Sequence, residues 1–576
     1  MKKIVQNLSK VLDKKQKINL GLLAILILIV GILETLGITA LAGLAAAIMT
    51  EDNKVVVMLK SWMGIEDHSK FVVIMLVALI VLYLVKSLFL IFSTYVQNRY
   101  IANNRNRMIS SVLREFLNKP YEFYLDADIP TVFRMTDSDI PQVFSLLLTL
   151  IQIATELVVA VFLSVVCLIS SFEMSCIMIL VLTVLTLVIT KGLKPVLHKY
   201  GEKNLTVQSR IAKWRIEAIY GIKDVKVLHR EEFFASHYQE TGKVGAVIAR
   251  KNSVLNALPR IVIEAVFMMC IMGYMIIKIM RGADASVIGG EIVALAAAAT
   301  RLLPCANRIN TYMANVNYCE PCLEYLAEHM DLDKIREANQ KKTEVITAPP
   351  LELDDKISLD HITYKYPNTE KYIFEDAHME VPKGKSVGII GTSGAGKSTI
   401  VDILLGLLKA EKGTITCDGR SIFENYPSWL TQIGYIPQTI YLVDEPIRNN
   451  IAFGIDDEEI DDAKIWHALE EAQLKEFVES LPEGLDTTIG DRGVRLSGGQ
   501  RQRLGIARAL YHNPSILVFD EATSALDNET ESALMEAING FHGKKTMVII
   551  AHRLNTIEKC DMVYKVVDGK IVETEL

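Results

Sequence analysis

The sequence predicts a multi-domain protein, with an all-α membrane domain of six transmembrane helices followed by an α/β domain that carries a phosphate-binding loop. Three observations support this prediction. The chain has 576 residues, which is too long for one compact domain. Half of its residues are hydrophobic, and the long apolar runs all lie within residues 1–325. Residues 351–576 instead alternate short apolar runs with polar ones and contain a glycine-rich motif.

Six apolar segments are long enough to cross a membrane as helices, which takes about 20 residues each. They are residues 18–49, 71–95, 141–169, 172–194, 254–280 and 286–318. Lysine and arginine gather in residues 1–17, 96–140 and 191–253, whereas the other connecting loops contain few of them. Positive charge favours the cytoplasmic side. We therefore expect a multi-pass protein of the inner (plasma) membrane, with both termini and the α/β domain in the cytoplasm.

The expected domain boundaries follow from these segments. Residues 1–17 carry apolar side chains on one helical face and lysines mostly elsewhere, which predicts a helix lying on the inner leaflet. Residues 18–325 are the membrane domain, residues 326–350 a polar linker that ends in two prolines, and residues 351–576 the α/β domain. In the outer loop, residues 50–70, the sequence fits a short amphipathic helix and an ordinary loop equally well.

Composition excludes some partners and sites. The net charge of −7 gives no indication of a nucleic-acid partner, and the eight scattered cysteines suit a reducing compartment. Cys319 and Cys322 have C-x-x-C spacing, but neither a second pair nor a strand–helix context accompanies them. We interpret them as two small apolar residues near a helix end.

The motif that follows the apolar stretch Ser386–Ile390 is a complete P-loop. It consists of Gly391, Thr392, Ser393, Gly394, Ala395, Gly396, Lys397 and Ser398, with Thr399 at the start of a predicted helix. The glycines let backbone N–H groups surround phosphates, and the helix N-terminus faces their negative charge. Lys397 is expected to reach the β- and γ-phosphates of a nucleotide, and Ser398 to bind Mg²⁺.

A second apolar stretch, Ile516–Phe519, ends in two carboxylates, Asp520 and Glu521. Asp520 is expected to hold Mg²⁺ through water, and Glu521 to polarise an attacking water as general base. A strand that merely ends in acidic residues is the alternative.

The segment Leu496-Ser-Gly-Gly-Gln500 lies between the P-loop and the acidic strand, and with it the sequence resembles the ATP-binding-cassette (ABC) ATPases. The other family elements follow in order: Tyr366, Gln438 after Tyr435-Ile-Pro, Asp491-Arg492-Gly493, Ser524-Ala-Leu-Asp527, and His552 between Ala551 and Arg553. The resemblance implies that Tyr366 stacks on adenine, that Gln438 senses Mg²⁺ and that His552 contacts the γ-phosphate.

The resemblance also implies ATP and Mg²⁺ as cofactors. Ser497, Gly498, Gly499 and Gln500 are expected to contact nucleotide held by a second subunit, since this signature lies far from its own P-loop. The catalytic residues would be Glu521, His552 and Lys397. Together with six apolar segments, these elements resemble an ABC exporter half-transporter that works as a homodimer.

Charged residues inside the apolar segments predict a substrate site, because membrane helices seldom carry charge without a function. The cations are Lys86, Arg260, Arg301 and Arg308. Arg301 and Arg308 are seven residues apart and share a helical face. Glu34, Glu156 and Glu264 are possible counter-ions, so internal ion pairing is the alternative.

The stretches Ala257–Glu264 and Arg301–Ile309, with Glu34, resemble the bacterial flippase that moves lipid-linked oligosaccharides for protein N-glycosylation. This implies an amphipathic anionic substrate and contact with membrane lipid. Lys86 stands where that flippase has an arginine, which keeps the charge but loses the bidentate fork. The alternatives are a general lipid, multidrug or peptide exporter, a soluble cassette ATPase, which the six apolar segments disfavour, and an ATP-gated channel, which Glu521 disfavours.

Overall fold

The computed structural model describes residues 2–49, 54–64, 67–170, 172–281, 285–330, 348–490, 493–521, 538–551 and 557–575. The chain divides into two compact units. The membrane unit comprises Met1–Lys119 and Asp128–Lys342. The second unit comprises Thr343–Leu576 together with the short segment Pro120–Ala127.

In the described residues of the membrane unit, all regular structure is helical. Its helices are α1 (Lys2–Val11), α2 (Lys14–Met49), α3 (Lys54–Met63), α4 (His68–Leu117), α6 (Ile129–Arg134), the π-helical turn η1 (Met135–Asp139), α7 (Ile140–Ser170), α8 (Phe172–Tyr220), α9 (Ile222–Val227), α10 (Glu231–Met280) and α11 (Ala285–His329). Each of the six long helices contains one of the six predicted spans, so the predicted all-α membrane domain is confirmed. Within the part of the chain that the structure describes, five of them are long and apolar enough to cross a membrane.

Several helices continue well beyond the apolar runs that predicted them. Helix α8 reaches Tyr220 although its apolar run ends near residue 194, and α10 begins at Glu231 although its run begins near residue 254. Hydropathy marks only the stretch suited to lipid, whereas the backbone hydrogen-bond ladder continues through polar residues. The basic region 191–253, expected as a loop, is therefore mostly two helical extensions joined by α9.

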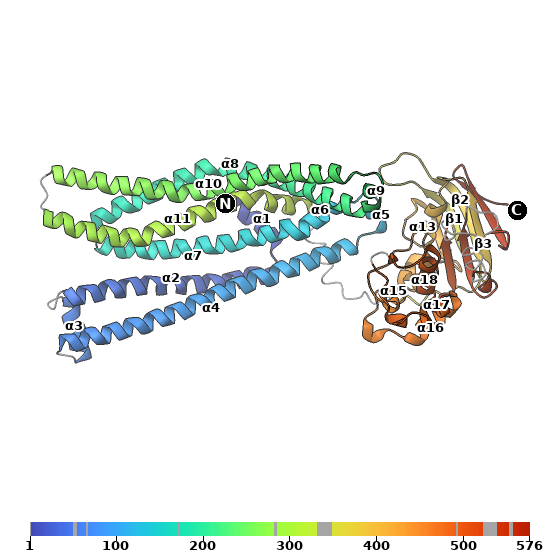
Figure 1. The fold of residues 1–576 in the computed structure, drawn as a ribbon, viewed down its shortest axis with the longest axis horizontal. Coiled ribbons are helices and arrows are strands. Elements are labelled where there is room, and N and C mark those ends of the chain that lie inside the picture. The colour runs from blue at the N-terminus through green and yellow to red at the C-terminus, as the bar shows by residue number, and fades with distance from the viewer. Residues whose placement is uncertain are drawn as a thin grey trace. The chain divides into compact units, whose positions relative to one another are not determined.

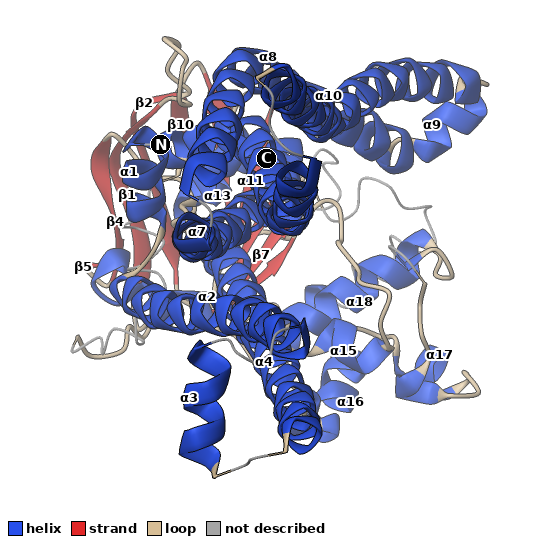
Figure 2. Cartoon of the chain, turned by 90° about the vertical axis from the view of Figure 1, so that its left-hand side faces the viewer, coloured by secondary structure: helices blue, strands red, loops and turns tan. Residues whose placement is uncertain are grey.

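The long helices pack as a bundle (Figure 1). Helix α2 packs against α4 and α7, α11 against α7 and α8, and α10 against α8. Figure 2 shows α3 as a separate short helix beside the ends of α2 and α4. Of the two readings of the outer loop, the helix is the one observed.

Helix α1 directs its apolar face into the membrane unit. Ile4 and Leu8 are buried and pack with α11, while Val5 on the same predicted face is 58% exposed. Lys3 Nζ lies 2.7 Å from Glu324 Oε1 on α11. The amphipathic pattern thus reflects packing against protein as well as an exposed edge.

The second unit contains two β-sheets and their covering helices. The strands are β1 (Lys356–Tyr364), β2 (Phe374–Pro382), β3 (Ser386–Gly391), β4 (Lys412–Cys417), β5 (Arg420–Ser421), β6 (Ile433–Ile436), β7 (Ile516–Asp520), β8 (Thr546–Ile550), β9 (Met562–Val567) and β10 (Lys570–Glu573). One sheet is antiparallel with order β2-β1-β4-β5; the other has order β10-β9-β3-β8-β7-β6 and is parallel except at β10. This confirms the predicted α/β domain.

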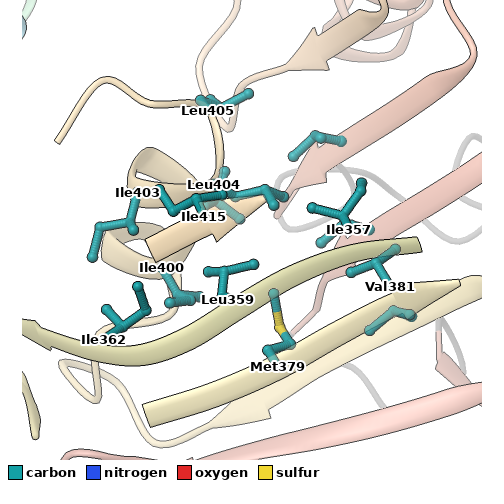
Figure 3. Close-up of a cluster of buried hydrophobic side chains, with 14 of the residues drawn as sticks. Ile357, Leu359, Ile362, Met379, Val381, Ile400, Ile403, Leu404, Leu405 and Ile415 are labelled. Carbon is teal, nitrogen blue, oxygen red and sulfur yellow. The ribbon is translucent and has the colours of Figure 1, made fainter. Parts of the chain in front are cut away.

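The helices of the second unit are mostly short. They are α5 (Tyr121–Leu125), α13 (Lys397–Leu404), α14 (Tyr426–Thr431), α15 (Ile447–Ile451), α16 (Asp462–Glu471), α17 (Lys475–Glu479) and α18 (Gly498–Leu510), with 3₁₀ turns η2 (Ile422–Asn425), η3 (Asp457–Glu459) and η4 (Gly484–Asp486). A core of buried aliphatic side chains joins α13 to the antiparallel sheet; Figure 3 shows Ile357 and Leu359 of β1 beside Met379 of β2 and Ile400 of α13. This core fixes the helix that follows the P-loop.

Helix α5 belongs to the second unit although it lies between α4 and α6 in the chain. The backbone N–H of Lys409 donates to Glu122 Oε1 at 2.9 Å, and Asn368 Nδ2 donates to Asp126 Oδ2 at 2.9 Å. These contacts attach a segment that lies between α4 and α6 in the chain to the second unit.

Candidate functional site

The P-loop connects β3 to α13, as the sequence predicts. Gly396 has φ +104°, and a Cβ there would lie 2.7 Å from Ile373 Cγ2 and 3.0 Å from Phe374 Cζ, so only glycine fits. Lys397 is buried, and its Nζ donates to the carbonyl oxygens of Gly391 at 3.1 Å and Thr392 at 3.3 Å. The ammonium group therefore lies against the loop whose N–H groups are expected to hold phosphates.

The acidic strand ends beside the P-loop helix. Ser398 Oγ donates to Asp520 Oδ1 at 3.3 Å. Asp520 is 8% exposed, and burial is the main reason that its pKa is raised. A hydroxyl and a carboxylate that meet from two elements form the oxygen donor set that Mg²⁺ prefers.

Glu521 follows Asp520 in a left-handed backbone conformation, with φ +49°. Non-glycine residues rarely adopt this conformation, and it is common at functional sites. Gln438 Nε2 donates to Glu521 Oε2 at 2.7 Å, which joins the two predicted residues in one hydrogen bond. Gln438 and Asp520 are thus joined to Glu521 and to the P-loop residue Ser398 by hydrogen bonds and chain connection, while their roles stay predictions.

Tyr366 lies in the connection between β1 and β2, next to the P-loop helix. Its hydroxyl forms a 2.8 Å hydrogen bond with Thr399 Oγ1, and its ring meets the Tyr364 ring edge-on at 5.4 Å. The residue is in the expected neighbourhood, and stacking on adenine remains a prediction.

The signature segment caps helix α18. Ser497 Oγ accepts from the Gln500 N–H at 3.2 Å, and Gln500 Oε1 accepts from the Ser497 N–H at 2.8 Å, which forms a capping box. Ser497 and Gly498 are exposed, whereas Gly499 is buried. The helix N-terminus is therefore held in place with an exposed hydroxyl at its tip.

Some predicted elements lie outside the described residues. These are His552, the Ser524–Asp527 segment, and Asp491 with Arg492. Their roles stay predictions.

The membrane unit contains a partly open, polar cavity of about 440 Å³. It is lined by Val30, Glu34, Lys86, Leu90, Thr155, Glu156, Val159, Leu163, Pro304, Cys305 and Arg308. Two of the four predicted cations therefore share one cavity, although they come from α4 and α11. The cavity also receives Glu34 from α2 and Glu156 from α7.

Each of these two cations is paired with an acid. Lys86 Nζ donates to Glu34 Oε2 at 2.9 Å, and Arg308 Nε lies 2.7 Å from Glu156 Oε1. Arg260 is exposed, and no ion pair joins it to Glu264 among the described residues. The side chain of Arg301 lies outside the described part of α11. In this conformation, Lys86 and Arg308 are therefore ion-paired within the protein, as the alternative to a substrate site expected.

Sequence reasoning missed Asp402, a half-buried acid on α13 near Asp520. The pKa of Asp402 is raised to about 6, mainly by burial and secondly by the negative charge of Asp520. A carboxylate among the apolar residues Ile400–Leu404 was the available signal. Tyr83 was also missed; its ring lies 5.3 Å from Lys86 Nζ.

Comparison with known proteins agrees with this geometry. The ABC transporter transmembrane region matches residues 20–279, and the ABC transporter domain matches residues 374–524. The chain is 41% identical over 223 residues to the ATP-dependent lipid A-core flippase of Shewanella frigidimarina, a match that covers 38% of this chain and 37% of the relative. It is 36% identical over 265 residues to the flippase of the same name from Alkalilimnicola ehrlichii, covering 44% of this chain and 45% of the relative. The matched segments thus span less than half of these relatives.

The fold also matches a solved structure. A bacterial Atm1-family ABC exporter with ATP bound has a TM-score of 0.75 and 22% identity to this chain, over 97% of this chain and 94% of that one. At this identity the likeness concerns the fold alone. Residues 20–279 therefore match the transmembrane region of ABC transporters, residues 374–524 match the ABC transporter domain, and the chain has the fold of a solved ABC exporter.

Proposed function

We propose that this chain is one half of an ATP-driven exporter, and that two copies move an amphipathic anionic molecule across the inner membrane, with the ATP-binding domains in the cytoplasm. The observation that carries the proposal is the charged cavity inside an apolar helical bundle. A charged side chain in such a position costs free energy, so charges found there usually have a function. The best candidate substrate is a lipid-linked oligosaccharide.

ATP hydrolysis would supply the energy. The P-loop amides and Lys397 would bind the phosphates, and Ser398, Gln438 and Asp520 would hold Mg²⁺, which supplies charge neutralisation at the phosphates. Glu521, held by Gln438 at 2.7 Å, would take the proton of the attacking water. Tyr366 would stack on the adenine and His552 would contact the γ-phosphate.

A homodimer would complete each ATP site. Ser497 and the amides of Gly498 and Gly499 stand at an exposed helix N-terminus, where a phosphate of nucleotide bound to the other copy would be favoured. Gln500 would hold this tip through its capping box. Because Glu521 is present, both sites of a homodimer would be competent.

The cavity suits a substrate that exchanges with the internal ion pairs. A phosphate on the substrate can replace Glu34 on Lys86 or Glu156 on Arg308, so no cation has to lose its partner during loading. Arg260 and Arg301 would extend the cationic surface. Glu156 Oε2 is buried and, among the described residues, has no hydrogen-bond partner, so it can accept from a sugar hydroxyl.

A lipid tail would stay in the bilayer while the head group crosses in the cavity. Relatives named as lipid A-core flippases support a lipid-attached substrate. A multidrug or peptide exporter would not need Lys86 and Arg308 in one cavity.

The test is ATPase stimulation of the reconstituted full chain by a panel of lipid-linked glycans, simple phospholipids, cationic drugs and peptides. Lipid-linked glycans should stimulate turnover most strongly. Stimulation should fall in the Arg308→Gln/Glu156→Gln variant and persist in the control Arg281→Gln, which changes an exposed arginine at the end of α10. Equal stimulation by drugs alone would contradict the proposed substrate class.

A further inference from the structure

The antiparallel sheet of the ATP-binding domain carries an exposed cluster that the exporter function does not use. His361 on β1 and Asp376 and His378 on β2 place one potential ligand atom each within 4.8 Å of one another. We propose that this cluster is a binding site for a divalent transition metal of the Zn²⁺ class, which links β1 to β2.

The strand register brings these side chains together. Leu359 pairs with Met379 and Ile362 with Ala377, so β1 has one extra residue between the two pairs. Next, Ile362 pairs with Ala377 and Tyr364 with Phe374, so here β2 has the extra residue. Two successive bulges, one on each strand, therefore lie at His361 and Asp376. Bulges re-aim side chains and often lie at functional sites.

The backbone conformations agree with this reading. His361 has φ +56° and Asp376 has φ +59°, both in the left-handed region. Leu359 and Ile362 both point into the core in Figure 3, which leaves Asp360 and His361 for the opposite side. Strand β4 packs closely against the bulge at Gly413. A Cβ on Gly413 would lie 2.5 Å from the carbonyl oxygens of Asp360 and His361, so only glycine allows this approach.

The donor atoms have the right chemistry and nearly the right spacing. Asp376 Oδ1 lies 2.6 Å from His361 Nδ1 and 3.7 Å from His378 Nε2. Around a tetrahedral Zn²⁺ with bonds of about 2.1 Å, donor atoms are roughly 3.4 Å apart. The 2.6 Å contact is a hydrogen bond between His361 and Asp376, which a bound metal would replace. The side chains are exposed enough to move to this spacing.

Asp360 adds a carboxylate beside His378. Its Oδ1 lies 3.8 Å from His378 Nδ1, which here accepts from the backbone N–H of His361 at 3.4 Å. Metal binding through Nε2 requires the other tautomer, in which the proton is on Nδ1 and can face the Asp360 carboxylate. With Asp360 and Asp376 the site also offers two negative charges to a divalent cation. Two imidazoles select Zn²⁺, Ni²⁺ or Cu²⁺ over Mg²⁺, which prefers oxygen ligands.

The full chain, purified in detergent without a polyhistidine tag and stripped with a chelator, provides the test. Co²⁺ is titrated without nucleotide and followed by visible absorption, with Zn²⁺ as competitor and Mg²⁺ as a non-competitor. The wild type should bind one more equivalent of Co²⁺ than the His361→Asn/His378→Asn variant. Asp360→Asn should weaken binding by about tenfold or more.

His467→Asn is the matched control, because His467 is exposed in the same domain with Glu471 3.9 Å away. It should bind like the wild type. Zn²⁺ should raise the melting temperature of the wild type and of this control, but not that of the double variant. If the double variant does not fold, His378→Asn alone answers the question. Equal stoichiometry and affinity in wild type and His378→Asn would overturn the site, whatever the outcome for transport.

Discussion

The cavity of the membrane unit and the phosphate site of the ATP-binding domain differ in how their charged side chains are arranged. Cations are paired with acids in the cavity, whereas two acids lie close together in the phosphate site. In the cavity, Lys86 and Arg308 each have a carboxylate within 2.9 Å. In the phosphate site, Asp402 and Asp520 lie near each other, and the pKa of each is raised by burial first. A paired cation is already neutralised, so only a competing anion displaces its carboxylate partner. Two neighbouring acids repel each other, which favours binding of a cation. The difference suggests one site for an anionic substrate and one for Mg²⁺ with ATP.

The largest expected effect tests the acidic side of this comparison. Glu521→Gln keeps the hydrogen-bonding shape but removes the general base, so ATP turnover should fall by roughly 10²–10⁴-fold while ATP binding persists. Turnover and nucleotide affinity of the full chain measure this. Hydrolysis at the wild-type rate by Glu521→Gln would show that Glu521 is not the general base. The control is Glu483→Gln, which changes an exposed acid in the same domain.

A smaller effect tests the paired side. Glu34→Ala leaves Lys86, whose side chain is 9% exposed, without its carboxylate, and should destabilise the membrane unit by about 3 kcal/mol. Lys86→Met together with Glu34→Ala should recover much of that loss, because no buried charge remains. Thermal unfolding in detergent measures both variants.

The exposed pair Lys356–Glu380 is the matched control for that cycle. Its atoms lie 2.6 Å apart, but both side chains are at least 40% exposed. Removing one partner should cost less than about 1 kcal/mol. Equal costs for the two pairs would contradict the view that burial makes the Lys86–Glu34 pair important.

The next prediction concerns pH. The pKa of Asp402 is about 6 in the folded domain against an ordinary value of 3.8, so the folded state binds its proton more readily than the unfolded state. The resulting destabilisation is absent below about pH 3.8 and complete above about pH 6. Asp402→Asn should therefore stabilise the domain at pH 7.5 by roughly 1–3 kcal/mol, with a smaller gain at pH 5. A gain that does not change with pH would show another cause.

The smallest expected effect concerns the α5 contacts. Glu122→Gln and Asp126→Asn weaken hydrogen bonds to exposed groups, so stability should change by less than about 1 kcal/mol. Substrate-stimulated turnover should fall more than basal turnover, because these contacts attach a loop of the helical half to the ATP-binding domain. Equal losses in both rates would argue against a coupling role.

The phosphate site was largely predictable because its residues lie in contiguous motifs whose backbone geometry is local. The contacts Ser398–Asp520 and Gln438–Glu521 link three of these motifs, and the roles of their residues stay predictions. For the cavity, the sequence named the cations and their possible counter-ions but not which of them pair. Glu34 and Lys86 are 52 residues apart, and their contact depends on how α2 packs on α4.

Other features depended on interactions that a sequence pattern does not show. The helical extensions of α8 and α10 consist of polar residues, so hydropathy gave no signal for them. The two bulges at His361 and Asp376 are set by strand register and by the close approach of Gly413. Composition alone would have placed these residues on an unremarkable sheet surface.

ATP-dependent flipping of a lipid-linked oligosaccharide by the reconstituted full chain tests the central claim most directly. The wild type and Arg281→Gln should translocate the glycan head group only with ATP and Mg²⁺. The variants Glu521→Gln and Arg308→Gln/Glu156→Gln should not, although the second should retain basal ATP hydrolysis. Normal flipping by a folded Arg308→Gln/Glu156→Gln variant would contradict the account, because the charged cavity would then have no part in transport.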